Sequence, residues 1–246
     1  MYFNYSDPWM IGLLVILVLQ NIKYYLNSPS ALLGLAISIP GILIGITFHE
    51  FAHAWVADKL GDDTPRRQGR LTLNPLAHLD PYGAILMLFA GFGWGKPVEI
   101  NPNNFNRKVA LKQGNAIVSF AGPAMNLILA VIFSIIYGLI VAVGNTLVLT
   151  TTGGVVLLAL QYTITMNVGL AIFNLIPLPP LDGSKIILIF LPTKARQWFE
   201  NNQRILYIFF LIIWITPISS WIISPAISAV NSGLMKLINA IVKFAH

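Results

Sequence analysis

The fold of this chain is decided by the stretch ALLGLAISIPGILIGITFHEFAH, residues 31–53. The part from 31 to 48 carries no charged side chain, and three ionisable residues then follow closely: His49, Glu50 and His53. About 20 consecutive apolar residues cross the roughly 30 Å hydrocarbon layer of a bilayer as one helix. The stretch therefore predicts a membrane-spanning helix with a polar, chemically competent end.

The composition of the whole chain extends the membrane prediction beyond this stretch. Apolar residues make up 56% of the 246 residues, charged residues 10%, and the mean hydropathy is +0.74. Soluble domains carry about 25% charged residues, so this chain has too little charge to cover a water-facing surface. We expect one all-α, polytopic, membrane-embedded domain over 1–246, with a core at about 31–190 and peripheral helices at 1–30 and 200–246.

About six transmembrane helices are expected from the long apolar runs. We place them at 9–26, 31–59, 114–143, 154–177, 205–223 and 226–244. The first run lacks a preceding basic segment and a small-residue cleavage pattern, so we expect a retained helix. The apolar segment 82–94 is too short to span. Its glycines and the prolines that follow predict a re-entrant or interfacial piece with a short β-hairpin near 82–105.

Basic residues gather in two segments of the chain. Residues 59–112 hold eight of the fifteen lysines and arginines, 185–204 hold another four, and 144–154 carry no charge. Cytoplasmic loops of membrane proteins are enriched in Lys and Arg. We therefore expect both basic segments in the cytoplasm, with the reactive residues nearer that face. Basic residues beside apolar spans fit contact with the lipid bilayer, and no aromatic-interleaved basic strip indicates nucleic acid.

The spacing of His49 and His53 predicts a metal site. Positions i and i+4 lie on one face of a helix, so both imidazoles can reach one ion. Glu50 lies about 100° round the helix, where it can take a proton from a water molecule beside the metal. The chain has no cysteine, so zinc would need imidazole and carboxylate ligands. The alternative is a solvated helix end with ordinary polar residues.

The third ligand that a catalytic zinc site needs is best supplied by Asp182. It follows Pro177, Pro179 and Pro180, which end the preceding helix at a depth comparable with that of His53. The alternative role for Asp182 is to cap the next segment.

Further polar residues lie inside the predicted spans. We interpret Thr163 and Asn167 as contacts between helices. Asn126 follows Gly122 and Pro123 by one turn. Its residue type fits either a contact between helices or a role in the chemistry.

Three ordered motifs resemble the site-2 proteases, a family of zinc-dependent intramembrane proteases. They are His-Glu-Phe-Ala-His at 49–53, Ala-Gly-Pro-Ala-Met-Asn at 121–126 and Phe-Asn-Leu-Ile-Pro-Leu-Pro-Pro-Leu-Asp-Gly at 173–183. Gly-Arg-Leu-Thr-Leu-Asn-Pro at 69–75 and Gly-Trp-Gly-Lys-Pro-Val at 93–98 resemble the compact prokaryotic branch, which has no PDZ-like or nucleotide-sensing domain.

The resemblance implies one zinc ion per chain, bound by His49, His53 and Asp182, with Glu50 as general base. It implies that Asn126 contacts the substrate backbone or the developing oxyanion. It further implies transmembrane client proteins as substrates and a prokaryotic cell membrane as the location. The implied substrate-binding residues, which would engage the client as an added strand, are Gly93, Trp94, Gly95, Lys96, Pro97 and Val98.

A metal-ion transporter and a non-catalytic metal-binding membrane protein are the alternative functions. Buried ionisable residues also mark ion pathways through membranes. Transport favours a row of sites across the bilayer, whereas these residues gather near one face beside a candidate base. The sequence does not indicate which client is cleaved or how many copies of the chain assemble.

Overall fold

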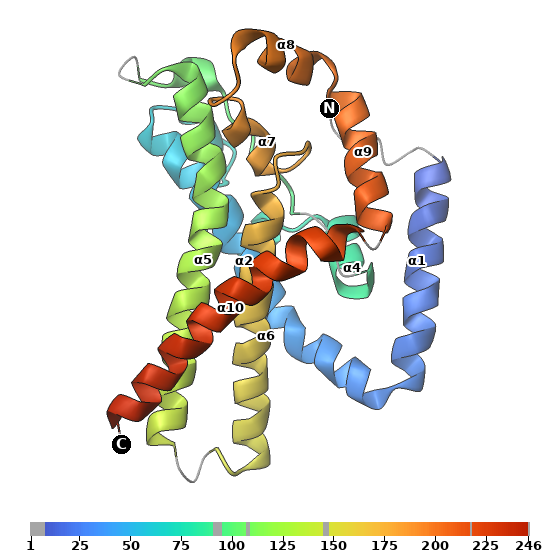
Figure 1. Ribbon diagram of the computed structural model, residues 1–246, viewed down its shortest axis with the longest axis vertical. Coiled ribbons are helices and arrows are strands. Elements are labelled where there is room, and N and C mark those ends of the chain that lie inside the picture. The colour runs from blue at the N-terminus through green and yellow to red at the C-terminus, as the bar shows by residue number, and fades with distance from the viewer. Residues whose placement is uncertain (1–7, 91–94, 107–108, 145–147, 217, 246) are drawn as a thin grey trace.

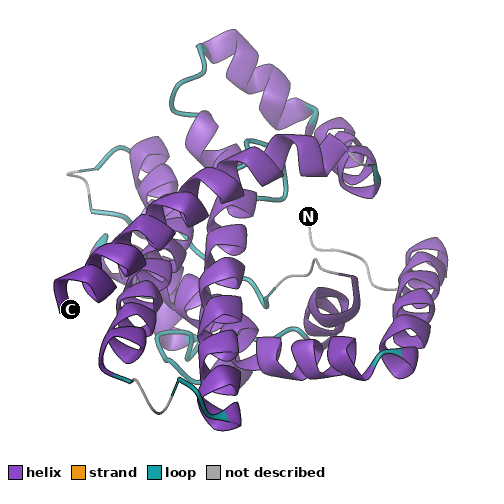
Figure 2. Ribbon diagram, turned by 60° about the horizontal axis from the view of Figure 1, so that its bottom comes forward, coloured by secondary structure: helices purple, strands orange, loops and turns teal. Residues whose placement is uncertain are grey.

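The computed structural model describes residues 8–90, 95–106, 109–144, 148–216 and 218–245. Within these ranges the chain forms helices and loops and no strand (Figure 2). The long helices are α1 (Pro8–Asn27), α2 (Pro29–Lys59), α5 (Leu111–Val143), α6 (Thr151–Asn174), α9 (Gln203–Ile215) and α10 (Ile218–Ala245). The short ones are α3 (Thr64–Arg67), η1 (Pro75–Ala77), α4 (Pro81–Ala90), η2 (Pro102–Asn104), α7 (Asp182–Ile187) and α8 (Thr193–Asn201).

Helices α2, α5 and α6 form the central bundle, and α10 crosses α5 and α6 at an angle (Figure 1). Helix α1 stands to one side with α4 packed against it. Within the described residues, four helices are long and apolar enough to span a membrane: α2, α5, α6 and the part of α10 from Ser220 to Ala245. The chain is therefore a multi-pass membrane protein, and the expected number of six spans is not confirmed.

Glycines allow α2 to lie close to α6. A Cβ atom on Gly41 would be 2.8 Å from the Cα of Thr163, and one on Gly45 would be 2.7 Å from the Leu170 side chain. Small residues at such crossings let helix backbones approach closely in membranes. The turn of α2 that continues from Gly45 to His49 is thereby held inside the bundle.

The boundary between the last two helices differs from the prediction. We expected the break near residues 224–225, but α9 ends at Ile215 and α10 runs through Pro225. Thr216 has an extended backbone with ψ of 159°. The sequence places a proline at 217, and a residue before proline is disfavoured in the helical region. The interior Pro225 is tolerated, as prolines in membrane helices often are.

The segment between α2 and α5 also differs in part from the expected hairpin. Residues 81–90 form helix α4, whose start is capped by the Asp80 carboxylate, which accepts the N–H of Gly83 at 2.9 Å. Of the expected strand pairing, the described residues show one antiparallel bridge, between Leu79 and Gly95. Residues 96–101 form neither helix nor strand, and Asn101 has an extended backbone.

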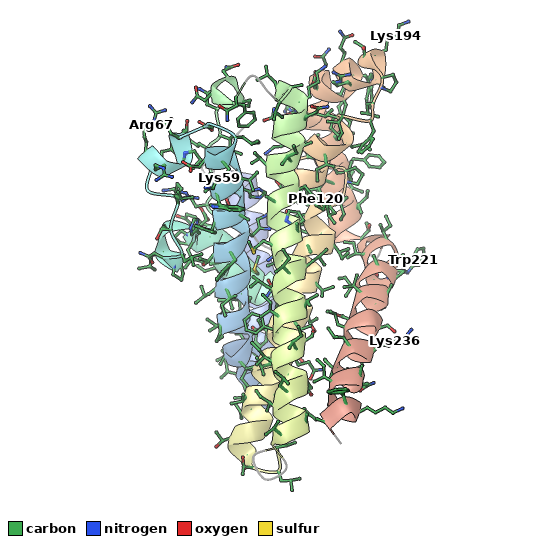
Figure 3. The ribbon with its side chains drawn as sticks, turned by 90° about the vertical axis from the view of Figure 1, so that its left-hand side faces the viewer. Lys59, Arg67, Phe120, Lys194, Trp221 and Lys236 are labelled. Atoms are coloured by element: carbon green, nitrogen blue, oxygen red, sulfur yellow. The ribbon has the colours of Figure 1, made fainter. Side chains whose placement is uncertain are left out.

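The charged and uncharged connections lie at opposite ends of the bundle. Helix α8 and the start of α5 are at one end, and the α5–α6 connection is at the other (Figure 1). Lys59, Arg67 and Lys194 point outward near the first of these ends (Figure 3). The basic segments therefore share one end of the molecule.

Candidate metal centre

Two separate parts of the chain bring three ligand side chains together. His49 and His53 lie one turn apart on α2, each only 7% exposed, and Asp182 is the first residue of α7. The Nε2 atoms of both histidines lie 3.1 Å from Oδ2 of Asp182. One ligand atom from each residue falls within 4.8 Å of the others, so all three can reach a single ion.

The loop before Asp182 is shaped by a close backbone approach. A Cβ atom on Gly183 would lie 2.3 Å from the carbonyl oxygen of Leu175, so only glycine fits after the aspartate. Asp182 makes no capping hydrogen bond, because the N-cap position of α7 is Leu181. The alternative role of Asp182 as a helix cap is therefore absent from this structure, and its carboxylate faces the histidines.

Each histidine is oriented by an acceptor at its other ring nitrogen. His53 Nδ1 lies 2.7 Å from the carbonyl oxygen of Val118, and His49 Nδ1 lies 2.6 Å from Oδ1 of Asn126. Because both partners are oxygen acceptors, each Nδ1 carries a proton, so each Nε2 can offer its lone pair to a metal ion. A metal-binding imidazole has this arrangement in most proteins. The chemistry of the donor set thus fits zinc, with two imidazoles and one carboxylate.

The backbone of α5 passes close to both histidine rings at Gly122. A Cβ atom on Gly122 would lie 2.5 Å from His53 Nε2 and 2.6 Å from His49 Nε2, distances that no real side chain makes. Sequence reasoning missed this contact, although glycine before proline in a membrane helix was the available signal. Gly122 keeps the space beside both nitrogens free of side-chain atoms.

The candidate base Glu50 contacts the loop segment 95–98. Its Oε2 accepts the backbone N–H of Val98 at 3.0 Å, and a Cβ atom on Gly95 would lie 3.4 Å from its Cγ. Of the predicted substrate-binding residues, Gly95, Lys96, Pro97 and Val98 are thus beside the candidate base. Gly93 and Trp94 lie outside the described residues.

Arg70 and His78 hold this segment in place, and sequence reasoning did not single them out. The Arg70 guanidinium donates to the carbonyl oxygens of Ala77 and Lys96, and the carbonyl of His78 accepts the N–H of Lys96 at 2.7 Å. His78 is fully buried, with Nε2 2.7 Å from the Thr72 carbonyl oxygen. The sequence feature that could have identified these two residues is an arginine and a histidine in a segment that otherwise has the composition of a loop.

Burial lowers the pKa of His78 below its ordinary value. The hydrogen bond to the Thr72 carbonyl opposes this change, and the positive charge of Arg70 adds to it. Nδ1 of His78 is buried without a partner, so a second proton would have no acceptor. We therefore take His78 as neutral, with its proton on Nε2.

Asn126 is placed differently from the predicted oxyanion contact. It is completely buried, its Oδ1 accepts from His49, and its Nδ2 lies 3.0 Å from the Gly45 carbonyl oxygen and 2.9 Å from Asn167 Oδ1. Both of its amide hydrogens therefore have partners within the protein. These contacts do not support the oxyanion role, which stays a prediction.

The chain was compared with known proteins. The model of Peptidase family M50 matches residues 150–216. YwhC of Bacillus subtilis (strain 168), which carries the name of a zinc metalloprotease, is 40% identical over 200 residues, 81% of this chain and 90% of the relative. Rip2 of Mycolicibacterium smegmatis, named in the same way, is 30% identical over 182 residues, 73% of this chain and 66% of the relative. No solved structure matches.

Proposed function

Because this chain belongs to peptidase family M50, the site-2 protease family, and is an intramembrane zinc metalloprotease, we propose that His49, His53 and Asp182 bind its zinc and that Glu50 is its general base. The observation that supports the ligand assignment is the approach of both Nε2 atoms to one oxygen of Asp182 at 3.1 Å. Three protein ligands leave one coordination position open, as catalytic zinc sites require.

The work of the reaction is divided between the ion and the protein. Zinc, when bound, supplies a Lewis acid that polarises the scissile carbonyl and makes the attacking water more acidic. Glu50 takes the proton from that water at a carboxylate oxygen and delivers it to the nitrogen of the departing amine. The two histidines are held by α2 in the central bundle, and Asp182 is held by α7, which packs against α5.

Segment 95–98 receives the substrate in this proposal. Gly95 already forms an antiparallel bridge with Leu79, so the segment can pair with a client peptide as an added strand, and Gly93 and Trp94 belong to the same proposed site. The N–H of Val98 donates to Glu50 Oε2, which leaves the other carboxylate oxygen, Oε1, to accept the proton from water. A client helix must also unwind, because helical hydrogen bonding hides its carbonyl groups.

The family acts on membrane-embedded substrates, and the finer location is part of the proposal. We place the chain in a prokaryotic cytoplasmic membrane with the site nearer the cytoplasmic face. The supporting feature is that α2 reaches the basic end of the molecule at Lys59, shortly after His53. Transport is less well supported, because the one group of potential metal ligands within the described residues is the cluster already discussed.

The proposal is tested by measuring zinc and cleavage on the same purified preparations. The wild-type protein should hold about one zinc per chain, and His49→Ala and Asp182→Ala should lose it or bind it weakly. Glu50→Gln should keep its zinc and lose cleavage of a transmembrane peptide. Full cleavage by Glu50→Gln would exclude the base assignment, and zinc retained by Asp182→Ala would require another third ligand.

A further inference from the structure

Asn126 and Asn167 form a buried hydrogen-bonded pair that ends on His49. We propose that both are positioning residues, which fix the His49 ring so that Nε2 faces the zinc before the ion binds. The inference rests on the proposed role of His49 as a ligand. It differs from the helix-contact role that the sequence suggested for Asn167, because it makes metal affinity depend on the pair.

The neighbours of Asn126 decide which of its atoms faces His49. Its Nδ2 lies 3.0 Å from the carbonyl oxygen of Gly45, and a carbonyl oxygen can only accept. The same Nδ2 lies 2.9 Å from Oδ1 of Asn167. Since both amide hydrogens are used in this way, Oδ1 is left to face His49 at 2.6 Å. A reversed amide would set its oxygen against the Gly45 carbonyl.

The orientation of Asn167 is fixed in turn by its own helix. Its Nδ2 donates to the carbonyl oxygen of Thr163 at 2.8 Å, so its Oδ1 is the atom presented to Asn126. Both asparagines are completely buried, and water cannot supply substitute partners. The donors therefore run in one direction, from His49 through Asn126 and Asn167 to the Thr163 carbonyl on α6.

This direction has a consequence for the metal site. A histidine that donates from Nδ1 keeps the lone pair of Nε2, which is the atom 3.1 Å from Asp182. The Nδ1 proton of His53 is held in the same way by the backbone carbonyl of Val118, which a side-chain substitution cannot remove. Of the two imidazoles, only His49 relies on side chains from α5 and α6. The zinc affinity should therefore be sensitive to both asparagines.

The test is a double-mutant cycle on zinc affinity, measured by chelator competition on Asn126→Leu, Asn167→Leu and the double variant. Asn126→Leu should bind zinc about 10- to 100-fold more weakly. Asn167→Leu should show a smaller loss, because the Gly45 carbonyl still holds the Asn126 amide. The double variant should be no weaker than Asn126→Leu alone, since Asn167 acts through Asn126.

Two further variants separate positioning from helix packing. Asn126→Asp keeps one oxygen acceptor for His49, and its second oxygen can face the Gly45 carbonyl when it carries a proton, so this variant should lose less zinc affinity than Asn126→Leu. Thr163→Val removes a buried hydroxyl on α6 but keeps the carbonyl that Asn167 uses, and should leave affinity unchanged.

Several outcomes would overturn the inference. Folded Asn126→Leu with wild-type affinity would do so, as would an equal loss in Asn126→Asp, or single losses that multiply in the double variant. If Asn126→Leu fails to fold, unchanged affinity in Asn167→Leu refutes the proposed pair. If His49→Ala binds zinc as the wild type does, the assignment of His49 as a ligand has failed. If His49→Ala loses zinc but both asparagine variants bind it normally, only the inference about the asparagines has failed.

Discussion

At Gly122, the backbone of α5 passes so close to both imidazoles that a methyl group has no room. The ideal Cβ position lies 2.5 Å from His53 Nε2 and 2.6 Å from His49 Nε2. Gly122→Ala must therefore push α5 away or turn the rings, and either change moves the ligand atoms. We expect zinc binding at least about tenfold weaker, measured by chelator competition.

A matched glycine on the neighbouring helix provides the control for this prediction. Gly169 lies within α6, and a Cβ atom there would meet nothing within 4 Å. Gly169→Ala should bind zinc as the wild type does and gain slightly in helix propensity. Wild-type zinc affinity in a folded Gly122→Ala variant would show that the site has room that this structure does not provide.

Individual residues differ in how far the sequence can predict them. The spacing of His49 and His53 fixes their common helix face and places Glu50 about 100° round the helix, so local geometry suffices. The partners of Asn126 come from α2 and α6, 81 and 41 positions away, and no local pattern encodes the direction in which its amide points. Gly122 is similar, because its contact depends on how closely two helices cross.

Among the elements, the loop segment 95–98 depends on Arg70 for its position beside Glu50. The guanidinium bonds to two carbonyl groups, those of Ala77 and Lys96, and hydrogen bonds to charged groups contribute about 1.5–3 kcal/mol. Arg70→Met should release the segment while the bundle stays folded. Hydrogen exchange at the amides of Lys96 and Val98 should then be faster than in the wild type.

Arg67 supplies the comparison, because it is an exposed arginine on α3 whose ion pair is with Asp63 of the same segment. Exposed ion pairs contribute little to stability. Arg67→Met should therefore leave the exchange at Lys96 and Val98 unchanged. Equal protection of these amides in Arg70→Met would mean that other contacts hold the segment.

The same segment should respond to acid through His78. The folded pKa of His78 is lower than its ordinary value of about 6.5, so protons bind more readily once the segment has opened. The free energy needed to open the segment is therefore highest above pH 6.5 and falls as the pH drops below that value. Hydrogen exchange at 95–98 should therefore speed up between pH 7.5 and 5.5, after correction for the intrinsic rate.

His78→Gln tests the origin of this response. Glutamine can still donate to the Thr72 carbonyl, but it cannot be protonated in this range. The variant should lose the acid-induced increase in exchange. An increase of wild-type size in the variant would assign the effect to another group.

Helices α2, α5 and α6 could be predicted, because the length of an apolar run is enough to identify a membrane-spanning helix. The prediction failed at the α9–α10 boundary, because two prolines, at 217 and 225, compete as breaks and tertiary packing selects between them. It was incomplete at 82–90, where the capping bond from Asp80 favours a helix over a hairpin.

At the scale of the whole molecule, we expect the two ends of the bundle to lie on opposite sides of the membrane. A reagent outside the cell should therefore reach only one of them. The chain has no cysteine, so single cysteines can be introduced without a background. Leu149 is 87% exposed beside the α5–α6 connection, and Asn103 is exposed in η2 at the basic end. In intact cells, a membrane-impermeant maleimide should label Leu149→Cys at once and Asn103→Cys only after permeabilisation.

Zinc content measured on both purified variants confirms that each is assembled. Labelling in the reverse order would invert the topology and move the site to the outer face. The rule behind the prediction, that Lys and Arg are enriched in cytoplasmic loops, concerns insertion rather than packing. It therefore predicts the orientation of the chain from the placement of its basic segments.

The order of the ligands along the chain has a further consequence for biosynthesis. Asp182 lies 133 positions after His49, so the ribosome completes the paired histidines long before the aspartate emerges. A nascent chain in the insertion machinery thus carries two imidazoles and a base, but lacks the carboxylate that completes the set. With the proposed ligand set, we therefore expect no zinc-dependent cleavage before residue 182 has been synthesised.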